Sequence, residues 1–251
     1  MSGGLEITGL DKSFDGVTAL ARFSCSISPG EIVGLIGPNG AGKTTLFNVI
    51  TGFMRADGGK AAFRGADLLS LPPHGVSEVG ISRTFQNLRL IRRLSVLENV
   101  LLAFKDQPGE YIGNVFLRPR SWRECESRNR EKAVGLLKDV GLGEKLDDPA
   151  DDLSYGQQKL LSLTCCIAAD AQLLLLDEPV AGIAPEMIER ILKIIRSLPE
   201  KGKSVILIEH NMEAVVQVCD RVIFMDAGVK IADGTPDDVR NDPRVIEAYL
   251  D

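Results

Sequence analysis

The sequence contains few of the residues that build metal centres and disulfide frameworks. Only two of its 251 residues are histidines, His74 and His210, which is too few for a histidine-rich metal site. Its five cysteines include no CxxC spacing, and the neighbours Cys165 and Cys166 are unsuited to an unstrained disulfide with each other. We therefore expect reduced thiols in the core of a cytosolic protein.

Long apolar runs and a basic excess are absent as well. No run approaches the roughly 20 residues that cross a bilayer, and the first six residues lack the basic and apolar regions of a secretory signal. The chain has 29 lysines and arginines against 35 acids, which gives a formal net charge of −6. Proteins that hold nucleic-acid phosphates usually carry the opposite balance, so we expect no nucleic-acid partner.

Short apolar runs alternate with helical patterns over most of the chain. Several runs are apolar almost throughout, which is typical of parallel strands covered on both faces. The runs predicted as strands are Leu5–Leu10, Glu31–Ile36, Ala61–Arg64, Gly80–Phe85, Leu173–Asp177, Ser204–Glu209 and Arg221–Met225. Helices are predicted to begin near Gly42, at Pro72, near Ser95, at Ser121, near Ser154 and at Pro185.

The middle of the chain shows helical patterns without the apolar strand-like runs found elsewhere. We find no convincing strand from about Asn87 to Ala168, and Ser121–Val140 is typical of a charged amphipathic helix. Ser121 and Glu124 have the spacing of a capping box at its start. The sequence therefore predicts one domain over 1–251, with an α/β core in 1–86 and 169–251 and a helical subdomain in 87–168.

The segment Gly37–Thr44 joins a predicted strand to a predicted helix. In that context the backbone N–H groups of a glycine-rich turn can wrap phosphates, and the helix N-terminus adds the positive end of its dipole. Lys43 can reach the β- and γ-phosphates, and the Thr44 hydroxyl can bind Mg²⁺. The alternative, an ordinary glycine turn, leaves the strand, loop and helix order unexplained. The predicted binding residues are Gly37, Pro38, Asn39, Gly40, Ala41, Gly42, Lys43, Thr44 and Thr45.

A second element, Leu173–Glu178, is an apolar run that ends in two acids. Many strands end in acidic turns, so the run is informative only together with the phosphate loop. Asp177 can hold the Mg²⁺ shell, as the second-strand aspartate does in P-loop NTPases. Glu178 then projects from the edge where open α/β sheets bind ligands, and it can polarise a water for attack on the γ-phosphate.

A third element, Leu153–Gln157, precedes a helix. Ser154 can cap that helix, and Gly156 leaves backbone open to an approaching anion. A Ser-x-Gly-Gln run is also a common helix start. Because the chain already has one phosphate site, we expect Ser154, Gly156 and Gln157 to complete a nucleotide site on another copy.

Together these elements resemble the ATP-binding subunits of ABC transporters over nearly the whole chain. Gly37–Thr44 resembles Walker A, Leu173–Asp177 resembles Walker B, and Leu153–Gln157 resembles the ABC signature. The order and spacing of these elements agree with those of the family.

Three further residues resemble functional positions of that family. Phe14 is similar to the A-loop aromatic that stacks on adenine, Gln86 to the Q-loop glutamine, and His210 to the switch histidine. Each has an alternative: Phe14 as a core aromatic, Gln86 as a surface amide, and His210 as a core histidine.

The resemblance implies an α/β fold with three parts: a RecA-like P-loop NTPase core, an N-terminal antiparallel β subdomain and an inserted α-helical subdomain. It implies ATP and Mg²⁺ as cofactors. Thr44, Gln86 and Asp177 would lie near the metal, and Glu178, His210 and Gln86 would take part in catalysis. It also implies two ATPase subunits that close head to tail around two ATP molecules.

Arg83–Leu90, Leu94–Val100 and Asp242–Leu250 resemble the ATPase subunits of branched-chain amino-acid importers. This implies a subunit on the cytoplasmic side, peripheral to the membrane. Its partners would be integral membrane permease subunits, a second ATPase (a paralogue or itself) and, indirectly, an extracytoplasmic substrate-binding protein. Related ATPases serve importers of urea, short amides and other small solutes. A non-transport ABC ATPase is a further alternative.

Overall fold

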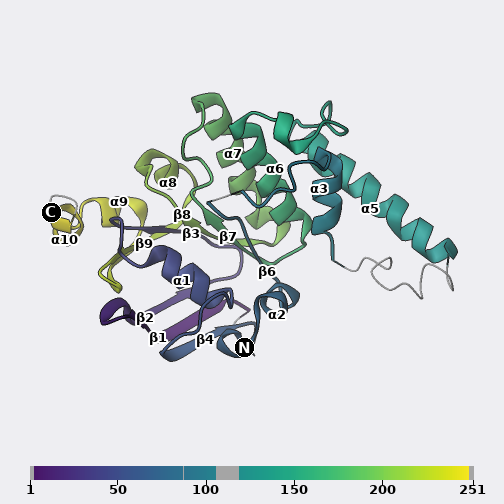
Figure 1. The fold of residues 1–251 in the computed structure, drawn as a ribbon. Coiled ribbons are helices and arrows are strands. Elements are labelled where there is room, and N and C mark those ends of the chain that lie inside the picture. Colours follow the sequence, from purple (N-terminus) through teal and green to yellow (C-terminus); the bar gives the residue numbers. More distant parts are fainter. Residues whose placement is uncertain (1–2, 87, 106–118, 249–251) are drawn as a thin grey trace. The chain divides into compact units, whose positions relative to one another are not determined.

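The computed structural model describes residues 3–86, 88–105 and 119–248 (Figure 1). The chain divides into two compact units. We call the first the sheet unit, which comprises Met1–Gln86, Ala171–Ala181 and Ile191–Asp251. The second, the helical unit, comprises Asn87–Asp170 and Gly182–Arg190.

The sheet unit contains a six-stranded sheet of order β10-β9-β3-β8-β7-β6 (Figure 1). Its central strands β3, β8 and β7 are parallel and wholly buried, as their apolar sequences predict. Only β10 runs antiparallel to its neighbour, β9. The strands are β3 (Ile32–Ile36), β6 (Ile81–Arg83), β7 (Leu173–Asp177), β8 (Ser204–Ile208), β9 (Arg221–Asp226) and β10 (Val229–Gly234).

The second sheet of this unit has the order β2-β1-β4-β5 and is antiparallel throughout. It confirms the expected N-terminal antiparallel subdomain. Asp15 and Gly16, both with positive φ, form the turn between β1 and β2, and an Asp-Gly pair favours this hairpin conformation. The strands are β1 (Leu5–Phe14), β2 (Val17–Ile27), β4 (Gly58–Phe63) and β5 (Ala66–Asp67).

All seven predicted strands are confirmed, with ends that differ by up to four residues. The prediction lacks β2, β5 and β10. β2 and β10 mix exposed, half-buried and buried positions without strict alternation, so their sequences carry no clear strand periodicity. β5 is only two residues long.

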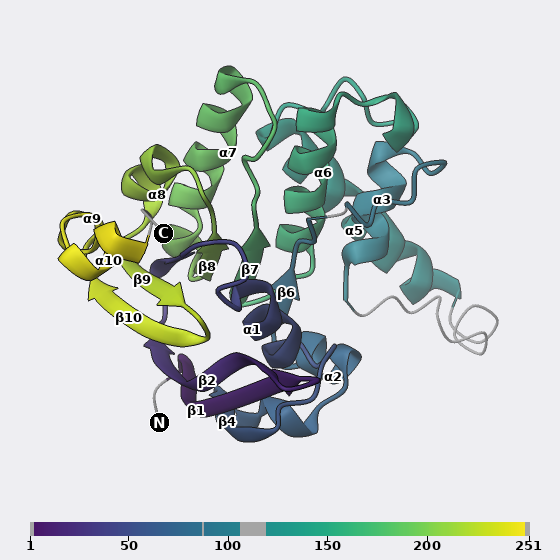
Figure 2. The same ribbon diagram turned by 60° about the vertical axis from the view of Figure 1, so that its left-hand side comes forward.

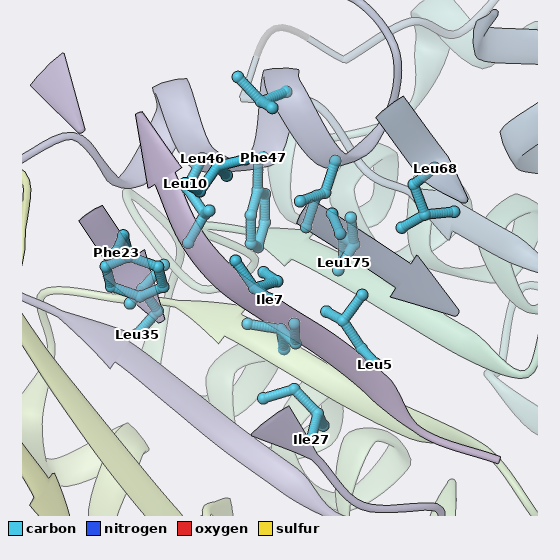
Figure 3. Close-up of a cluster of buried hydrophobic side chains, with 14 of the residues drawn as sticks. Leu5, Ile7, Leu10, Phe23, Ile27, Leu35, Leu46, Phe47, Leu68 and Leu175 are labelled. Carbon is cyan, nitrogen blue, oxygen red and sulfur yellow. The ribbon is translucent and has the colours of Figure 1, made fainter. Parts of the chain in front are cut away.

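Helix α1 (Lys43–Ile50) shares one buried apolar cluster with both sheets (Figure 3). Phe47 of α1 lies in this cluster with Leu10 of β1 and Leu175 of β7. Figure 2 shows α1 between the two sheets. This packing fixes the position of α1, and so of the short loop that joins β3 to it. The other helices of the sheet unit are α2 (Pro73–Glu78), α8 (Met212–Val218), α9 (Pro236–Arg240), α10 (Pro243–Ala248) and the last part of α7 (Pro185–Ser197), with short 3-10 turns η1 (Leu68–Ser70) and η4 (Pro199–Lys201).

The helical unit consists of helices packed on one another and has no strand among its described residues. Its buried side chains include Leu97 and Val100 of α3, Leu137 of α5, and Leu160 and Leu161 of α6. The helices are α3 (Val96–Ala103), α5 (Pro119–Asp139), α6 (Tyr155–Ala168) and the start of α7, with a 3-10 turn, η3 (Ala150–Asp152).

Most predicted helix starts are confirmed to within one residue, but the start at Ser121 is wrong. Helix α5 begins at Pro119, so Ser121 lies inside its first turn and not before it. The reason is that proline is itself favoured in the first turn of a helix, and this signal precedes Ser121. The predicted capping box of Ser121 with Glu124 rests on a side chain that lies outside the described part of the structure.

Across the described ranges, no helix combines the length and apolarity that a membrane span requires. None of the five cysteines forms a disulfide. Burial raises the pKa of Cys25, Cys165 and Cys219 to about 12.

We predict that Leu10→Ala lowers the free energy of unfolding by about 2–5 kcal/mol, because it leaves a cavity in the shared cluster. Leu10 is fully buried in β1. The matched control, Val17→Ala on the neighbouring strand β2, removes a side chain that is 70% exposed and should cost about 0.5 kcal/mol or less. Urea unfolding measures both variants. Equal losses would contradict the cluster as the main source of stability of this unit.

Candidate nucleotide site

The loop between β3 and α1 is held tightly against neighbouring backbone. A Cβ added to Gly37 would lie 1.9 Å from the Met225 carbonyl oxygen, and one added to Gly42 would lie 2.3 Å from the Ala19 carbonyl oxygen. Both glycines have positive φ. Gly42 is the N-cap of α1 and provides no side-chain cap, so the helix start has no side chain covering its N–H groups. The loop therefore presents backbone N–H groups and the positive helix end to an incoming anion.

Lys43, the first residue of α1, is 6% exposed. Its Nζ donates to the carbonyl oxygens of Gly37 at 2.7 Å and Pro38 at 2.8 Å. Burial lowers the pKa of Lys43, while the nearby carboxylates of Glu178 and Asp177 raise it. Within the described ranges, no carboxylate forms an ion pair with this ammonium. A buried cation with neutral partners fits a site for phosphate.

The rest of the predicted loop varies in exposure. Gly37, Ala41 and Lys43 are buried, Pro38, Gly42 and Thr45 are half-buried, and Asn39, Gly40 and Thr44 are exposed. The structure thus brings all nine predicted loop residues into one turn of chain at the start of α1. The exposed Thr44 hydroxyl is available to a metal ion.

Asp177 ends β7 and is buried. Its Oδ2 accepts a hydrogen bond from Arg83 Nη2 at 2.9 Å, across the pair of parallel strands β6 and β7. The backbone N–H of Asp177 donates to Thr84 Oγ1 at 3.0 Å. Arg83 therefore fixes the carboxylate that we predicted as a metal ligand, and Thr84 fixes the backbone of the same residue.

The three predicted catalytic residues meet at the carboxylate of Glu178, which contacts both His210 and Gln86. Its Oε1 lies 3.1 Å from His210 Nε2, and its Oε2 accepts a hydrogen bond from Gln86 Nε2 at 3.2 Å. The backbone of Glu178 has φ 49°, which costs a residue with a side chain of order 1–3 kcal/mol. Its N–H donates to the Ile208 carbonyl oxygen at 2.9 Å, so the strained turn is tied to β8.

These contacts bear on the alternatives for single residues. His210 has a side chain that is 41% exposed, so it is not a core histidine. Phe14, at the end of β1, is 41% exposed and is not a core aromatic. Lys12 Nζ lies 5.3 Å from the Phe14 ring centroid. Gln86 is exposed, yet its amide nitrogen is engaged by Glu178.

Glu209 is a buried residue that the sequence analysis missed. It is 2% exposed, and its two oxygens accept hydrogen bonds from the N–H groups of Val180 at 2.9 Å and His210 at 3.2 Å. It therefore ties the turn after Glu178 to the turn that carries His210. The signal available in the sequence was an acid directly before the histidine at the end of an apolar strand.

The predicted signature residues belong to the helical unit. Ser154 and Gln157 form a reciprocal capping box at the start of α6, with distances of 3.3 Å and 3.0 Å. This confirms Ser154 as the helix cap. A Cβ at Gly156 would lie 3.0 Å from Met187 Cγ, so α7 packs closely against this glycine. Tyr155 is 49% exposed.

The sheet unit therefore has the parts that phosphoryl chemistry needs. It offers an anion-binding turn with a buried lysine, and oxygen ligands for a hard cation from Thr44, Asp177 and the amide of Gln86. Glu178, which follows Asp177, supplies a second carboxylate, and this carboxylate contacts both His210 and Gln86. These residues fit ATP with Mg²⁺.

Comparison with known proteins gives one consistent result. Residues 20–181 match the ABC transporter family, and residues 229–250 match the C-terminal family described as branched-chain amino acid ATP-binding cassette transporter. The LivG high-affinity branched-chain amino acid transport ATP-binding protein of Escherichia coli K12 is 38% identical over 98% of this chain and 97% of its own. The probable LivG protein of Archaeoglobus fulgidus is 39% identical over 98% and 95%.

A solved structure agrees in fold over the full length. A nucleotide-free ATP-binding cassette from an ABC transporter has a TM-score of 0.85 and 34% identity, with 100% of both chains covered. The chain therefore belongs to the ABC transporter family and, within it, to the group of ATP-binding proteins that includes LivG.

Proposed function

We propose that this chain binds and hydrolyses ATP as the energy-supplying subunit of an importer for branched-chain amino acids. The observation that carries the ATPase part is the convergence of Gln86 and His210 on Glu178. This cluster lies at the ends of parallel strands, where open α/β sheets bind ligands. The names of its relatives and the match of residues 229–250 support the substrate class.

In this proposal the turn from Gly37 to Thr45 binds the ATP phosphates. The N–H groups of the turn and the positive N-terminal end of α1 stabilise the negative charge of the phosphates. Lys43 exchanges its two carbonyl partners for phosphate oxygens. Phe14 provides the aromatic surface for adenine. Thr44, Asp177 and Gln86 would hold Mg²⁺, which neutralises phosphate charge when bound.

Glu178 acts as the general base of hydrolysis. Each of its oxygens has one partner, His210 at Oε1 and Gln86 at Oε2. A carboxylate oxygen can accept a second hydrogen bond, so an attacking water can approach Glu178 and give up its proton to it. Because Gln86 would turn its amide toward the metal, Oε2 is the oxygen with more room for this water. His210 then keeps the carboxylate in place through Oε1.

The helical unit supplies the other half of a nucleotide site. Ser154, Gly156 and Gln157 would face the γ-phosphate bound by a second ATPase subunit, a paralogue or another copy of this chain. In this organisation 1–86 and 169–251 form the nucleotide-binding core and 87–168 form the helical signature subdomain. The further partners are permease subunits on the cytoplasmic face of the membrane and, through them, an extracytoplasmic substrate-binding protein. We expect no nucleic-acid partner.

The proposal is tested by purifying the tagged chain from native membranes in mild detergent. Co-purification of integral membrane subunits and a second ATPase is expected, and a calorimetric screen of the associated binding protein should find leucine, isoleucine or valine. Recovery of no membrane subunit would contradict the importer. Binding of urea or a short amide alone would contradict only the substrate class.

We predict that Lys43→Ala weakens ATP binding about 10- to 100-fold, because a hydrogen bond to a charged group contributes about 1.5–3 kcal/mol. A fluorescent ATP analogue measures the affinity by titration. Lys201→Ala removes an exposed lysine of the same unit and serves as the control. An unchanged affinity in the Lys43 variant would refute the phosphate loop.

We predict that Glu178→Gln lowers the rate of ATP hydrolysis by about 10²–10⁴-fold, the usual contribution of a general base. Its ATP affinity should stay within about twofold of that of the unchanged chain, since glutamine keeps the size of the side chain. Phosphate release measures hydrolysis, and Glu200→Gln, at an exposed acid, is the control. Near-normal turnover in the Glu178 variant would exclude the general-base role.

A further inference from the structure

Arg83 is buried inside the candidate site without a role in the function derived so far. It is the last residue of β6, and its side chain is 5% exposed beside an Asp177 side chain that is 4% exposed. An arginine is rarely buried this deeply unless several partners hold it. Its contacts therefore indicate what it does.

The edge of the guanidinium contacts polar groups of α1, of its C-cap residue and of β7. Nη1 donates to Asn48 Oδ1 at 2.7 Å and lies 3.5 Å from Thr51 Oγ1. Nη2 donates to Asp177 Oδ2 at 2.9 Å. One planar group thus connects the helix that follows the phosphate loop to the carboxylate that ends β7.

The guanidinium is also covered by aromatic rings. Its Cζ lies 5.2 Å from the ring centroid of Phe47 and 4.9 Å from that of Phe85. Phe85 in turn packs edge-to-face on Phe53, with centroids 5.6 Å apart. Arginine suits such a setting because its planar cation stacks on rings while its N–H groups bond in the plane. A lysine could supply the charge but not this fixed geometry.

The contact engages only one oxygen of Asp177. Over the ranges that the structure describes, Oδ1 of that carboxylate has no hydrogen bond or ion pair. The negative charges of Glu178 and Asp177 both raise the pKa of Lys43, so these carboxylates lie close to the phosphate loop. Arg83 therefore fixes the carboxylate through Oδ2 and leaves Oδ1 for the metal shell.

We propose that Arg83 is a positioning residue for the divalent cation, which acts by orienting the Asp177 carboxylate. The proposal rests on the proposed ATPase function. Residues that orient a metal-binding carboxylate typically contribute about 10–100-fold to metal affinity. A simple charge effect has the opposite sign, because removal of a neighbouring cation would strengthen binding of a divalent metal.

The test measures Mn²⁺ affinity, with the imido analogue of ATP bound, by electron paramagnetic resonance of the free ion. For Arg83→Gln the Mn²⁺ dissociation constant should rise about tenfold or more. Arg83→Lys should show a smaller rise, and Phe85→Leu, which removes one covering ring, a smaller one still. Analogue affinity without metal should stay within about twofold of the unchanged chain in all three.

Arg221→Gln is the matched control. Arg221 makes equally short bonds to Glu31 and Asp233, but these lie among β3, β9 and β10, away from Asp177. It should lose thermal stability while keeping the Mn²⁺ affinity. If Arg83→Gln does not fold, Arg83→Lys is compared with this control in the same way.

An Arg83 variant whose Mn²⁺ affinity is unchanged or stronger would overturn the positioning role, and so would an equal loss in Arg221→Gln. Failure of the unchanged chain to bind the analogue at all would instead overturn the proposed function. The two failures are therefore distinguishable.

Discussion

The parallel register of β6, β7 and β8 is the constraint on which the site depends. Leu175 of β7 lies level with Arg83 of β6, and Asp177 lies level with Ile208 of β8. The residues that follow these positions leave the sheet at the same edge. A shift of one residue in either pair would turn alternate side chains to the other face of the sheet. The separate segments that carry Gln86, Glu178 and His210 meet because this register is fixed.

Buried charge is the second feature that defines the site, and each charged group has its own form of compensation. Lys43 is bound by two carbonyl oxygens, Asp177 by a guanidinium, and Glu209 by two backbone N–H groups. Lys43 is the one cation among these three groups, and its two hydrogen-bond partners are neutral carbonyl oxygens. An anionic ligand would therefore gain most at Lys43, while Asp177 and Glu209 are already held in place.

Hydrophobic packing of helix α1 also supports the site. Phe47 lies in the apolar cluster of the two sheets and also stacks on the guanidinium of Arg83. Helix α1 therefore contributes Leu46, Phe47, Val49 and Ile50 to the core, while Asn48 and the C-cap residue Thr51 contact Arg83.

The sequence alone determined the parts whose signal is local. Apolar runs identified the central strands, the glycine loop with Lys43 identified the phosphate site, and the acids after Leu176 marked the edge of the sheet. Strands β2 and β10 were missed because their burial depends on neighbours and not on periodicity. The start of α5 was misplaced because two helix signals, Pro119 and Ser121, stand close together.

Only the tertiary structure decided which residues touch. Arg83 and Asp177 are far apart in the sequence, and nothing in either segment specifies a buried ion pair between them. The same holds for the carboxylate of Glu209, which reaches the Val180 N–H only because β7 and β8 are adjacent. Such contacts result from strand order and register, which many residues set jointly, whereas a motif reports only the residues within it.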